Sequence, residues 1–219
     1  SIHLRDFDQN KSVHVIILKG LEQSFAAGLD IKSLAGDYSH ISENMQKMQD
    51  YFKILFQIQK PIIAVVSGFA LGVGCEIILC CDIVLATDNS RFGMPELSLG
   101  LLPCFGGAGM LCSQIGKAKT MDMVLSGRAL SADEAEKAGL ISRVVDSSSL
   151  TEEYTKLARR IASLPQKSVC LAKKIIASQA FHQNADLEMR FGLNCVESPD
   201  FKQVLLNFSS RAPSKEEKA

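Results

Sequence analysis

Residues 62–76, IIAVVSGFALGVGCE, decide the fold. The first five of them are apolar and mostly β-branched, which is typical of a strand buried on both faces. Residues 68–74 contain three glycines and predict a bend, and residues 75–80 predict a short apolar helix after it. A buried strand that leads through a bend into a helix favours an α/β fold.

The flanking sequence continues this alternation and becomes helical toward the C-terminus. Two capping boxes, Ser131-x-x-Glu134 and Ser149-x-x-Glu152, predict helix starts, and Gly139 is placed to end the first of these helices. Pro61 ends a long amphipathic helix. The expected elements are strand 13–18, loop 21–30, helix 42–60, strands 62–66, 83–86 and 140–145, helices 149–163 and 167–180, and a helix that begins at Ser198-Pro199.

Composition excludes several classes of protein. The 219 residues suit one large domain, or one domain with a helical appendage. Lys plus Arg and Asp plus Glu both number 24, which argues against a dedicated nucleic-acid binder. No apolar run reaches the roughly 18 residues of a membrane span. The first six residues resemble neither a signal peptide nor a transit peptide.

The seven cysteines form an odd count, and several stand in apolar segments. Buried, reduced thiols explain this pattern and imply a reducing compartment. A metal site is the alternative, but the sequence contains no Cys-x-x-Cys pair. We therefore expect no metal.

Two glutamates stand among apolar neighbours, where a carboxylate is costly to bury. Glu76 precedes Ile77-Ile78-Leu79, and Glu96 lies within Phe92-Gly93-Met94-Pro95-Glu96-Leu97. Burial raises the pKa of a carboxyl group toward neutrality, where it can both give and take protons. The alternative is that each glutamate caps a helix or pairs with a surface lysine.

Two glycine-containing segments could supply backbone N–H groups to the same site. They are residues 27–30, Ala-Gly-Leu-Asp, and residues 72–74, Gly-Val-Gly. Two such groups could hold the oxygen of a polarised thioester carbonyl. The alternative is that these glycines only form tight turns. The sequence has no Gly-x-Ser-x-Gly elbow, no complete dinucleotide fingerprint and no phosphate loop.

Taken together, these motifs resemble the enoyl-CoA hydratase/isomerase (crotonase) family, and enoyl-CoA hydratases most closely. The likeness runs from about residue 13 to residue 145, and more loosely to residue 208. The segments that carry it are FAAGLDIK (25–32), KPIIAVVSGFALGVGCE (60–76), CDI (81–83), FGMPELSLGLLP (92–103), GG (106–107), SGR (126–128) and AGL (138–140).

The resemblance implies the α/β crotonase (ClpP-like) spiral of ββα units. Residues 1–145 would form the spiral core, residues 146–208 a helical region that makes trimers, and residues 209–219 a loose tail. Relatives begin a few dozen residues earlier, so the family's N-terminal strand and helix are expected to be missing. We expect this to uncover part of the sheet.

The resemblance also implies the roles of residues. The backbone N–H groups of Leu29 and Val73 would form the oxyanion hole. Glu76 would activate the water that attacks the β-carbon, and Glu96 would protonate the α-carbon and help to hold that water. No cofactor would be resident, because coenzyme A arrives on the substrate. The residues expected to contact coenzyme A or the substrate are Ala27, Gly28, Leu29, Asp30, Ile31, Lys32, Gly72 and Val73.

Glutamate at both positions is the pattern of a hydratase, a lyase that adds water to trans-2-enoyl-CoA. The alternatives are an enoyl-CoA isomerase or other crotonase chemistry, and an inactive, truncated scaffold subunit. Val73 stands where the family usually has glycine, and Leu29 where alanine is common, so we expect a reshaped acyl pocket. The expected assembly is a homotrimer or hexamer that binds an acyl-CoA and no nucleic acid. Fatty-acid oxidation would place it in the mitochondrial matrix or the cytoplasm.

Overall fold

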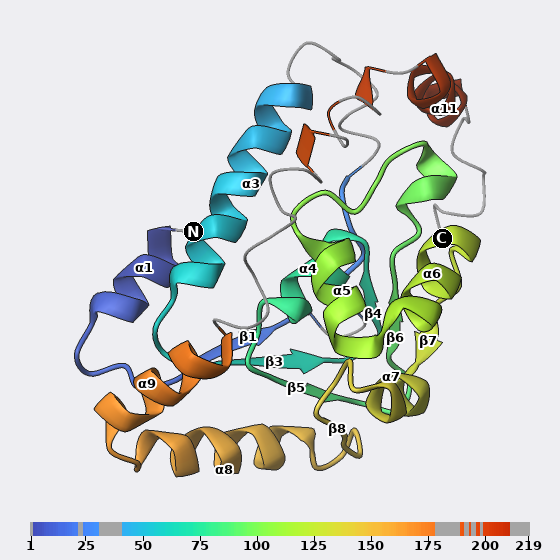
Figure 1. Ribbon diagram of the computed structural model, residues 1–219. Coiled ribbons are helices and arrows are strands. Elements are labelled where there is room, and N and C mark those ends of the chain that lie inside the picture. Colours follow the sequence, from blue (N-terminus) through green and yellow to red (C-terminus); the bar gives the residue numbers. More distant parts are fainter. Residues whose placement is uncertain are drawn as a thin grey trace, which may run out of the picture.

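The computed structural model describes residues 2–21, 24–30, 41–177, 189–190, 193, 196–197 and 199–210. Its strands form two four-stranded sheets (Figure 1). The first sheet has the order β1 (Ile16–Lys19), β3 (Ile62–Val66), β5 (Ile83–Ala86) and β8 (Arg143–Val144). The second has the order β2 (Ser24–Ala26), β4 (Phe69–Leu71), β6 (Arg91–Gly93) and β7 (Leu130–Ser131).

Helices connect and cover the two sheets. They include α1 (Ile2–Gln9), α3 (Ile41–Gln57), α4 (Val73–Leu79), the 3-10 helix η2 (Glu96–Leu99), α5 (Gly107–Ile115), α6 (Lys117–Ser126), α7 (Ala132–Ala138), α8 (Leu150–Ala162), α9 (Gln166–Ala177) and α11 (Pro199–Ser210). No helix in the described part of the chain is long and apolar enough to cross a membrane.

The chain winds as a spiral that gives one strand to each sheet in every turn. The first turn is β1, β2 and α3, the second is β3, β4 and α4, and the third begins with β5 and β6. All pairs are parallel except β6 with β7. This winding confirms the predicted spiral of ββα units.

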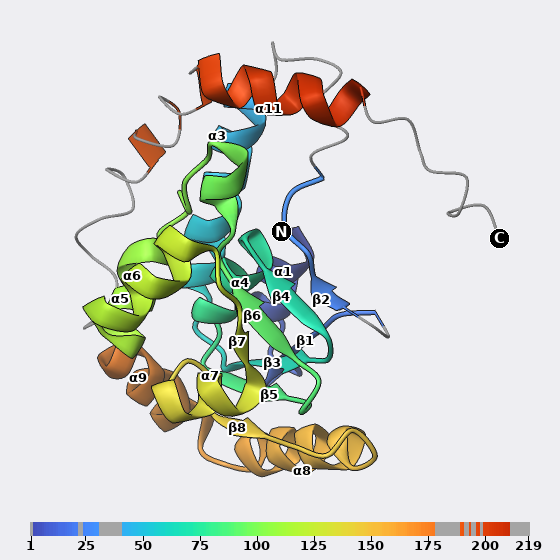
Figure 2. The same ribbon diagram turned by 90° about the vertical axis from the view of Figure 1, so that its right-hand side faces the viewer.

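Strand β3 is buried on both faces, as its apolar sequence predicts. Successive side chains of a strand point to opposite faces. Ala64 and Val66 therefore pack into the core that α4, α5 and α6 share, whereas Ile63 and Val65 pack against α8. Figures 1 and 2 both show α8 along the outer side of this sheet. The strand thus anchors the spiral and the C-terminal helices together.

Several elements differ from the expectation. The predicted loop 21–30 contains β2, and the predicted bend 68–74 contains β4. Helix α1 and strand β6 were not expected at all. Three-residue strands carry too little periodicity to be recognised, and they exist because parallel neighbours pair with them. The strand expected at 140–145 shortens to β8.

The helix ends were predicted with mixed success. The Ser131 capping box forms in full, and Gly139 ends that helix with φ +84°. The second box was wrong, because Ser149 has α-helical backbone angles and its side chain makes no capping bond. Helix α11 begins at Pro199, and the expected cap, Ser198, lies outside the described residues.

Candidate active site

The predicted site residues follow three neighbouring parallel strands. Leu29 follows β2, Val73 follows β4, and Glu96 follows β6. Because β2, β4 and β6 are parallel and adjacent, their carboxyl ends meet at one edge of the second sheet (Figure 2). The carboxyl ends of parallel strands are the usual place for a ligand in open α/β sheets.

Glycines let the loops at this edge approach one another closely. Gly28 has φ +103°, and a Cβ on this residue would lie 3.4 Å from the carbonyl oxygen of Leu71. Gly72 has φ +54°, and a Cβ there would lie 3.0 Å from Oε1 of Glu96. A Cβ on Gly74 would overlap the backbone of Ala26. The glycines therefore do more than form turns, because they bring the three loops and the Glu96 carboxylate together.

Glu76 is held by the backbone of a distant segment. It lies in the first turn of α4 and is 1% exposed. Its Oε1 accepts a hydrogen bond from the N–H of Phe105, at 2.9 Å, and another from the N–H of Gly107, at 3.0 Å. A carboxylate that accepts backbone N–H bonds is stabilised in its ionised form.

Glu96 has very different surroundings. It opens η2 and is 8% exposed. Within the described part of the chain, neither of its carboxylate oxygens has a hydrogen-bond partner. Burial raises the pKa of Glu96 from 4.5 to about 7. The group can therefore carry a proton at neutral pH and release it.

The two carboxylates lie close to one buried thiol. Burial is the largest cause that raises the pKa of Cys75, and the charges of Glu96 and Glu76 raise it further. Cys75 is completely buried and protonated, so its sulfur is not available as a nucleophile. No cluster of three or more potential metal ligands occurs among the residues that the structure describes.

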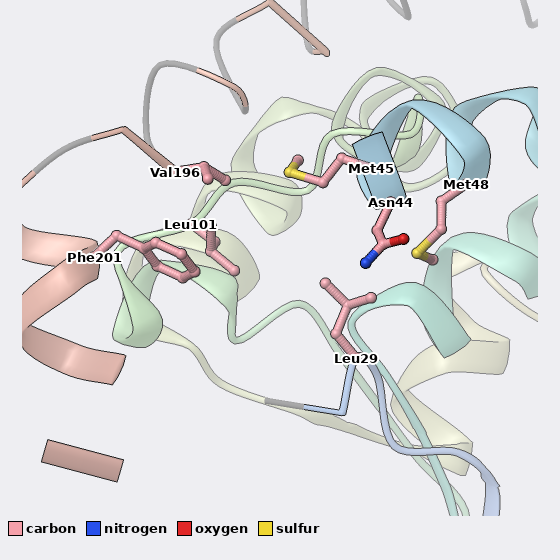
Figure 3. Close-up of a pocket in the computed structure, with 7 residues that line it drawn as sticks. All are labelled: Leu29, Asn44, Met45, Met48, Leu101, Val196 and Phe201. Atoms are coloured by element: carbon pink, nitrogen blue, oxygen red, sulfur yellow. The ribbon is translucent and has the colours of Figure 1, made fainter. Parts of the chain in front are cut away.

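An apolar pocket opens beside Leu29 (Figure 3). Its empty volume is about 290 Å³, including its open mouth. The lining comes from the loop after β2, from α3, from the segment after η2 and from the C-terminal part of the chain: Leu29, Asn44, Met45, Met48, Leu101, Val196 and Phe201. The backbone of Phe201 lies against Gly100, which ends η2, the 3-10 helix that Glu96 begins.

Half of the ten predicted site residues lie together at this place. Gly72, Val73 and Glu96 surround the edge of the second sheet, and Gly28 and Leu29 face them from the loop after β2. Ala27 and Asp30 are exposed in that loop. Ile31 and Lys32, the remaining predicted contacts, lie outside the described residues.

Sequence reasoning missed the partners of Glu76 and part of the pocket. Phe105 and Gly107 were not singled out for any role, although the Gly106-Gly107 pair was a visible signal. Met45 and Met48 were predicted as core on the helical stripe of residues 42–60. The structure places them in the core around α3 and also in the pocket wall.

Comparisons with known proteins agree with this arrangement. The profile of the enoyl-CoA hydratase/isomerase family matches residues 1–208. The chain is 37% identical over 209 residues to "Enoyl-CoA hydratase, mitochondrial" of Pongo abelii, which covers 94% of this chain and 71% of that protein. It is 45% identical over 170 residues to "Probable enoyl-CoA hydratase, mitochondrial" of Dictyostelium discoideum, with 78% of this chain covered. The chain spans only 61% of the length of that second relative.

Solved structures with a similar fold come from the same family. A crystal structure of an enoyl-CoA hydratase/isomerase from Pseudoalteromonas atlantica superimposes with a TM-score of 0.84 at 28% sequence identity. That match covers 97% of this chain and 86% of the other. Sequence profile, curated relatives and fold thus agree, and the chain belongs to the enoyl-CoA hydratase/isomerase family, with the crotonase fold.

Proposed function

We propose that this protein is an enoyl-CoA hydratase, a lyase that adds water reversibly to trans-2-enoyl-CoA to give 3-hydroxyacyl-CoA. The observation that carries the proposal is the pair of buried glutamates with contrasting surroundings. Glu76 accepts two backbone N–H bonds, whereas Glu96 has a pKa of about 7. One acid and one base of this kind are what a hydration requires.

The thioester carbonyl would be polarised by two backbone N–H groups, those of Leu29 and Val73. Val73 is the first residue of α4, and N–H groups in the first turn of a helix have no acceptor within the helix. Two donors at the developing oxyanion would stabilise the enolate. Because these donors are backbone groups, valine in place of the family's usual glycine retains the function.

Glu76 and Glu96 would divide the proton transfers between them. Glu76 would take a proton from water as the water oxygen forms its bond to the β-carbon, and the π electrons would pass to the thioester oxygen. Glu96 would then give its proton to the α-carbon as the enolate collapses. The product gains one water in total, and the proton on Glu76 returns to Glu96 before the next cycle.

The substrate would extend from this edge in two directions. Coenzyme A would lie along residues 27–32 and along Gly72, and it would leave with the product, so no resident cofactor is required. The acyl chain would enter the apolar pocket beside Leu29. Among the described residues that line the pocket, Asn44 is the one polar residue and none is charged, which favours an uncharged acyl chain.

The assembly and the compartment form part of the same proposal. A homotrimer or hexamer is the arrangement that the resemblance implies, with the helical region after residue 145 as the contact. Reduced cysteines and the printed names of two relatives favour a reducing compartment such as the mitochondrial matrix, with the cytoplasm as the alternative.

The direct test is the loss of the enoyl-thioester absorbance when the protein is mixed with crotonyl-CoA, beside the Glu96→Gln variant. We expect rapid loss with the native protein and a rate lower by about 10³-fold in the folded variant. Similar rates in both proteins would refute the role of Glu96. If the native protein leaves crotonyl-CoA unchanged, the hydratase proposal fails. Movement of a 3-enoyl double bond would then indicate an isomerase, and no turnover of any acyl-CoA would indicate a scaffold subunit.

A further inference from the structure

The segment that holds Glu76 has a conformation suited to one anionic oxygen. Gly106 lies between the two donors and has φ +100°, a left-handed conformation. A left-handed residue between two donors can turn their backbone N–H groups into one concavity, called a nest, which binds an anion. Here the N–H groups of Phe105 and Gly107 converge on Oε1 of Glu76. The orientation of the carboxylate therefore depends on the backbone of residues 105–107.

The nest fits tightly around its carboxylate. A Cβ on Gly107 would overlap the carboxyl group of Glu76, so only glycine leaves room at this position. The ring of Phe105 is 2% exposed, which means that this residue is also enclosed by protein. A shift of the Phe105 backbone would consequently lengthen at least one of the two bonds to Oε1.

A residue of α3 supports this segment from the other side. The ring of Phe52 stacks on the ring of Phe105 with centroids 5.1 Å apart and planes 7° from parallel. Phe52 is 3% exposed and belongs to the same core cluster as Phe105. An offset stack at this distance contributes attraction beyond simple burial and limits rotation of both rings. Phe52 is not among the residues that line the pocket, but it belongs to the same core cluster as four of them, Met45, Leu101, Val196 and Phe201.

We propose that Phe52 is a positioning residue for Glu76, acting through the ring of Phe105 to hold the nest in place. The inference rests on the proposed function, in which Glu76 is the base that activates water. Without the ring of Phe52, the Phe105 backbone gains freedom and the carboxylate of Glu76 loses orientation. Neither ring is among the residues proposed to contact coenzyme A, so loss of the stack is expected to lower turnover more than affinity for a short acyl-CoA.

The test compares Phe52→Leu with a matched core variant, Ile63→Val, in the full chain. Ile63 is fully buried in the cluster against α8, away from the nest. We expect Phe52→Leu to lower kcat for crotonyl-CoA about tenfold or more with KM little changed, because misplaced catalytic groups slow the chemical step. The acidic limb of its kcat profile should move to higher pH, because a lost N–H bond disfavours the ionised carboxylate. Ile63→Val should retain both kcat and profile.

A second measurement does not depend on activity. Carbon-13 labelling of glutamate side chains, with Glu76 assigned from the spectrum of Glu76→Gln, would follow the titration of that carboxyl. We expect its midpoint to move to higher pH in Phe52→Leu and to stay in place in Ile63→Val. If the native protein does not hydrate crotonyl-CoA, the proposed function fails, but this titration still decides the role of Phe52.

Two results would overturn the inference. One is an unchanged Glu76 titration in Phe52→Leu. The other is an equal loss of kcat in Phe52→Leu and Ile63→Val, which would indicate general destabilisation. Should Phe52→Leu fail to fold, Phe105→Leu removes the same stack from the other side. It is expected to give the same signature, and its failure to do so would count equally against the proposal.

Discussion

Glu76 and Glu96 are the same residue type, both are buried, and both lie near Cys75, yet their surroundings differ sharply. Glu76 is bound by two backbone N–H groups from the start of α5. Glu96 lies against Gly72, and its oxygens have no hydrogen-bond partner in the described part of the chain. Burial alone therefore does not set the chemistry of a carboxylate, because the backbone donors decide whether its charge is tolerated.

In the proposed mechanism, this contrast gives each group a different protonation state before the substrate binds. A carboxylate bound by backbone donors favours the ionised form and can accept a proton. A carboxyl group with a pKa of about 7 can keep its proton at neutral pH and donate it. Substitutions around the two glutamates should abolish the difference between them, whereas substitutions in the pocket or at Val73 should leave it unchanged.

After the loss of activity already expected for Glu96→Gln, the largest effect on activity is expected from Gly107→Ala, which should abolish the contrast. The new methyl group would overlap the Glu76 carboxyl, so the side chain must turn out of the nest. We expect kcat to fall by about 10²-fold, as misplacement of a catalytic group commonly does. Gly127→Ala is the matched control. Gly127, unlike Gly107, has positive φ, but a Cβ there meets no atom within 4 Å, so kcat should be retained despite the backbone strain. Full activity in Gly107→Ala would contradict the nest.

Glu96→Gln should change how the free energy of unfolding depends on pH, and so test the difference between the two glutamates. The folded pKa, about 7, lies above the ordinary glutamate value of 4.5, so between these pH values the folded chain binds a proton that the unfolded chain has released. The free energy of unfolding therefore falls as pH rises through this range, by about 3 kcal/mol in total, and stays lower above pH 7. Glutamine removes this titration.

Urea unfolding at pH 5 and pH 8 tests this expectation. Relative to the native protein, Glu96→Gln should gain stability between the two pH values, by most of the roughly 3 kcal/mol. Any constant cost of burying the amide cancels in that comparison. The same difference in stability at both pH values would show that Glu96 titrates normally in the folded protein.

A smaller effect is expected in the pocket, away from both carboxylates. Met48→Phe places a larger and stiffer side chain in the wall beside Leu29 (Figure 3). We expect kcat/KM for a ten-carbon enoyl-CoA to fall about tenfold relative to crotonyl-CoA, the usual scale for a hydrophobic pocket. The pH dependence of kcat should not move, because neither carboxylate is touched. Equal losses for both substrates would mean that the acyl chain lies elsewhere.

The smallest effect is expected from Val73→Gly, which restores the residue that the family usually has. The backbone N–H proposed for the oxyanion hole is retained, so kcat should change by no more than about threefold. Helix α4 loses about 1 kcal/mol because glycine is a poor helix former, and removal of the half-buried Val73 side chain adds a further loss of packing. Steady-state kinetics with crotonyl-CoA and thermal unfolding check both values. A large gain in kcat would show that valine obstructs the site.

Much of the site could be predicted because its signals are local in the chain. Glu76 and Glu96 stand out as carboxylates among apolar neighbours, and the glycines at 28, 72 and 74 mark close backbone approaches. The partners of Glu76 could not be predicted in this way. Phe105 and Gly107 lie 29 and 31 residues further along the chain, and only the packing of α5 against α4 brings them to Oε1.

The same limit explains the errors in the fold. Strand β3 has five apolar residues and was predicted at its true bounds. Strands β2, β4 and β6 have three residues each, and they are defined by their neighbours in the second sheet rather than by their own patterns. Met45 belongs to the predicted helical stripe, but no local feature indicates that Phe201 closes the same pocket.

The parallel pairing of β2, β4 and β6 sets a fixed spacing for the segments that carry the proposed chemistry. Neighbouring strands lie about 4.8 Å apart, so the sheet fixes the spacing of the strand ends from which the segments of Leu29, Val73 and Glu96 continue. These intervals belong to the hydrogen-bond ladder of the backbone and are present before any substrate binds. An enzyme built on such a sheet can change the side chains that line its acyl pocket, and with them its preferred substrate. The backbone that positions its reacting groups stays the same.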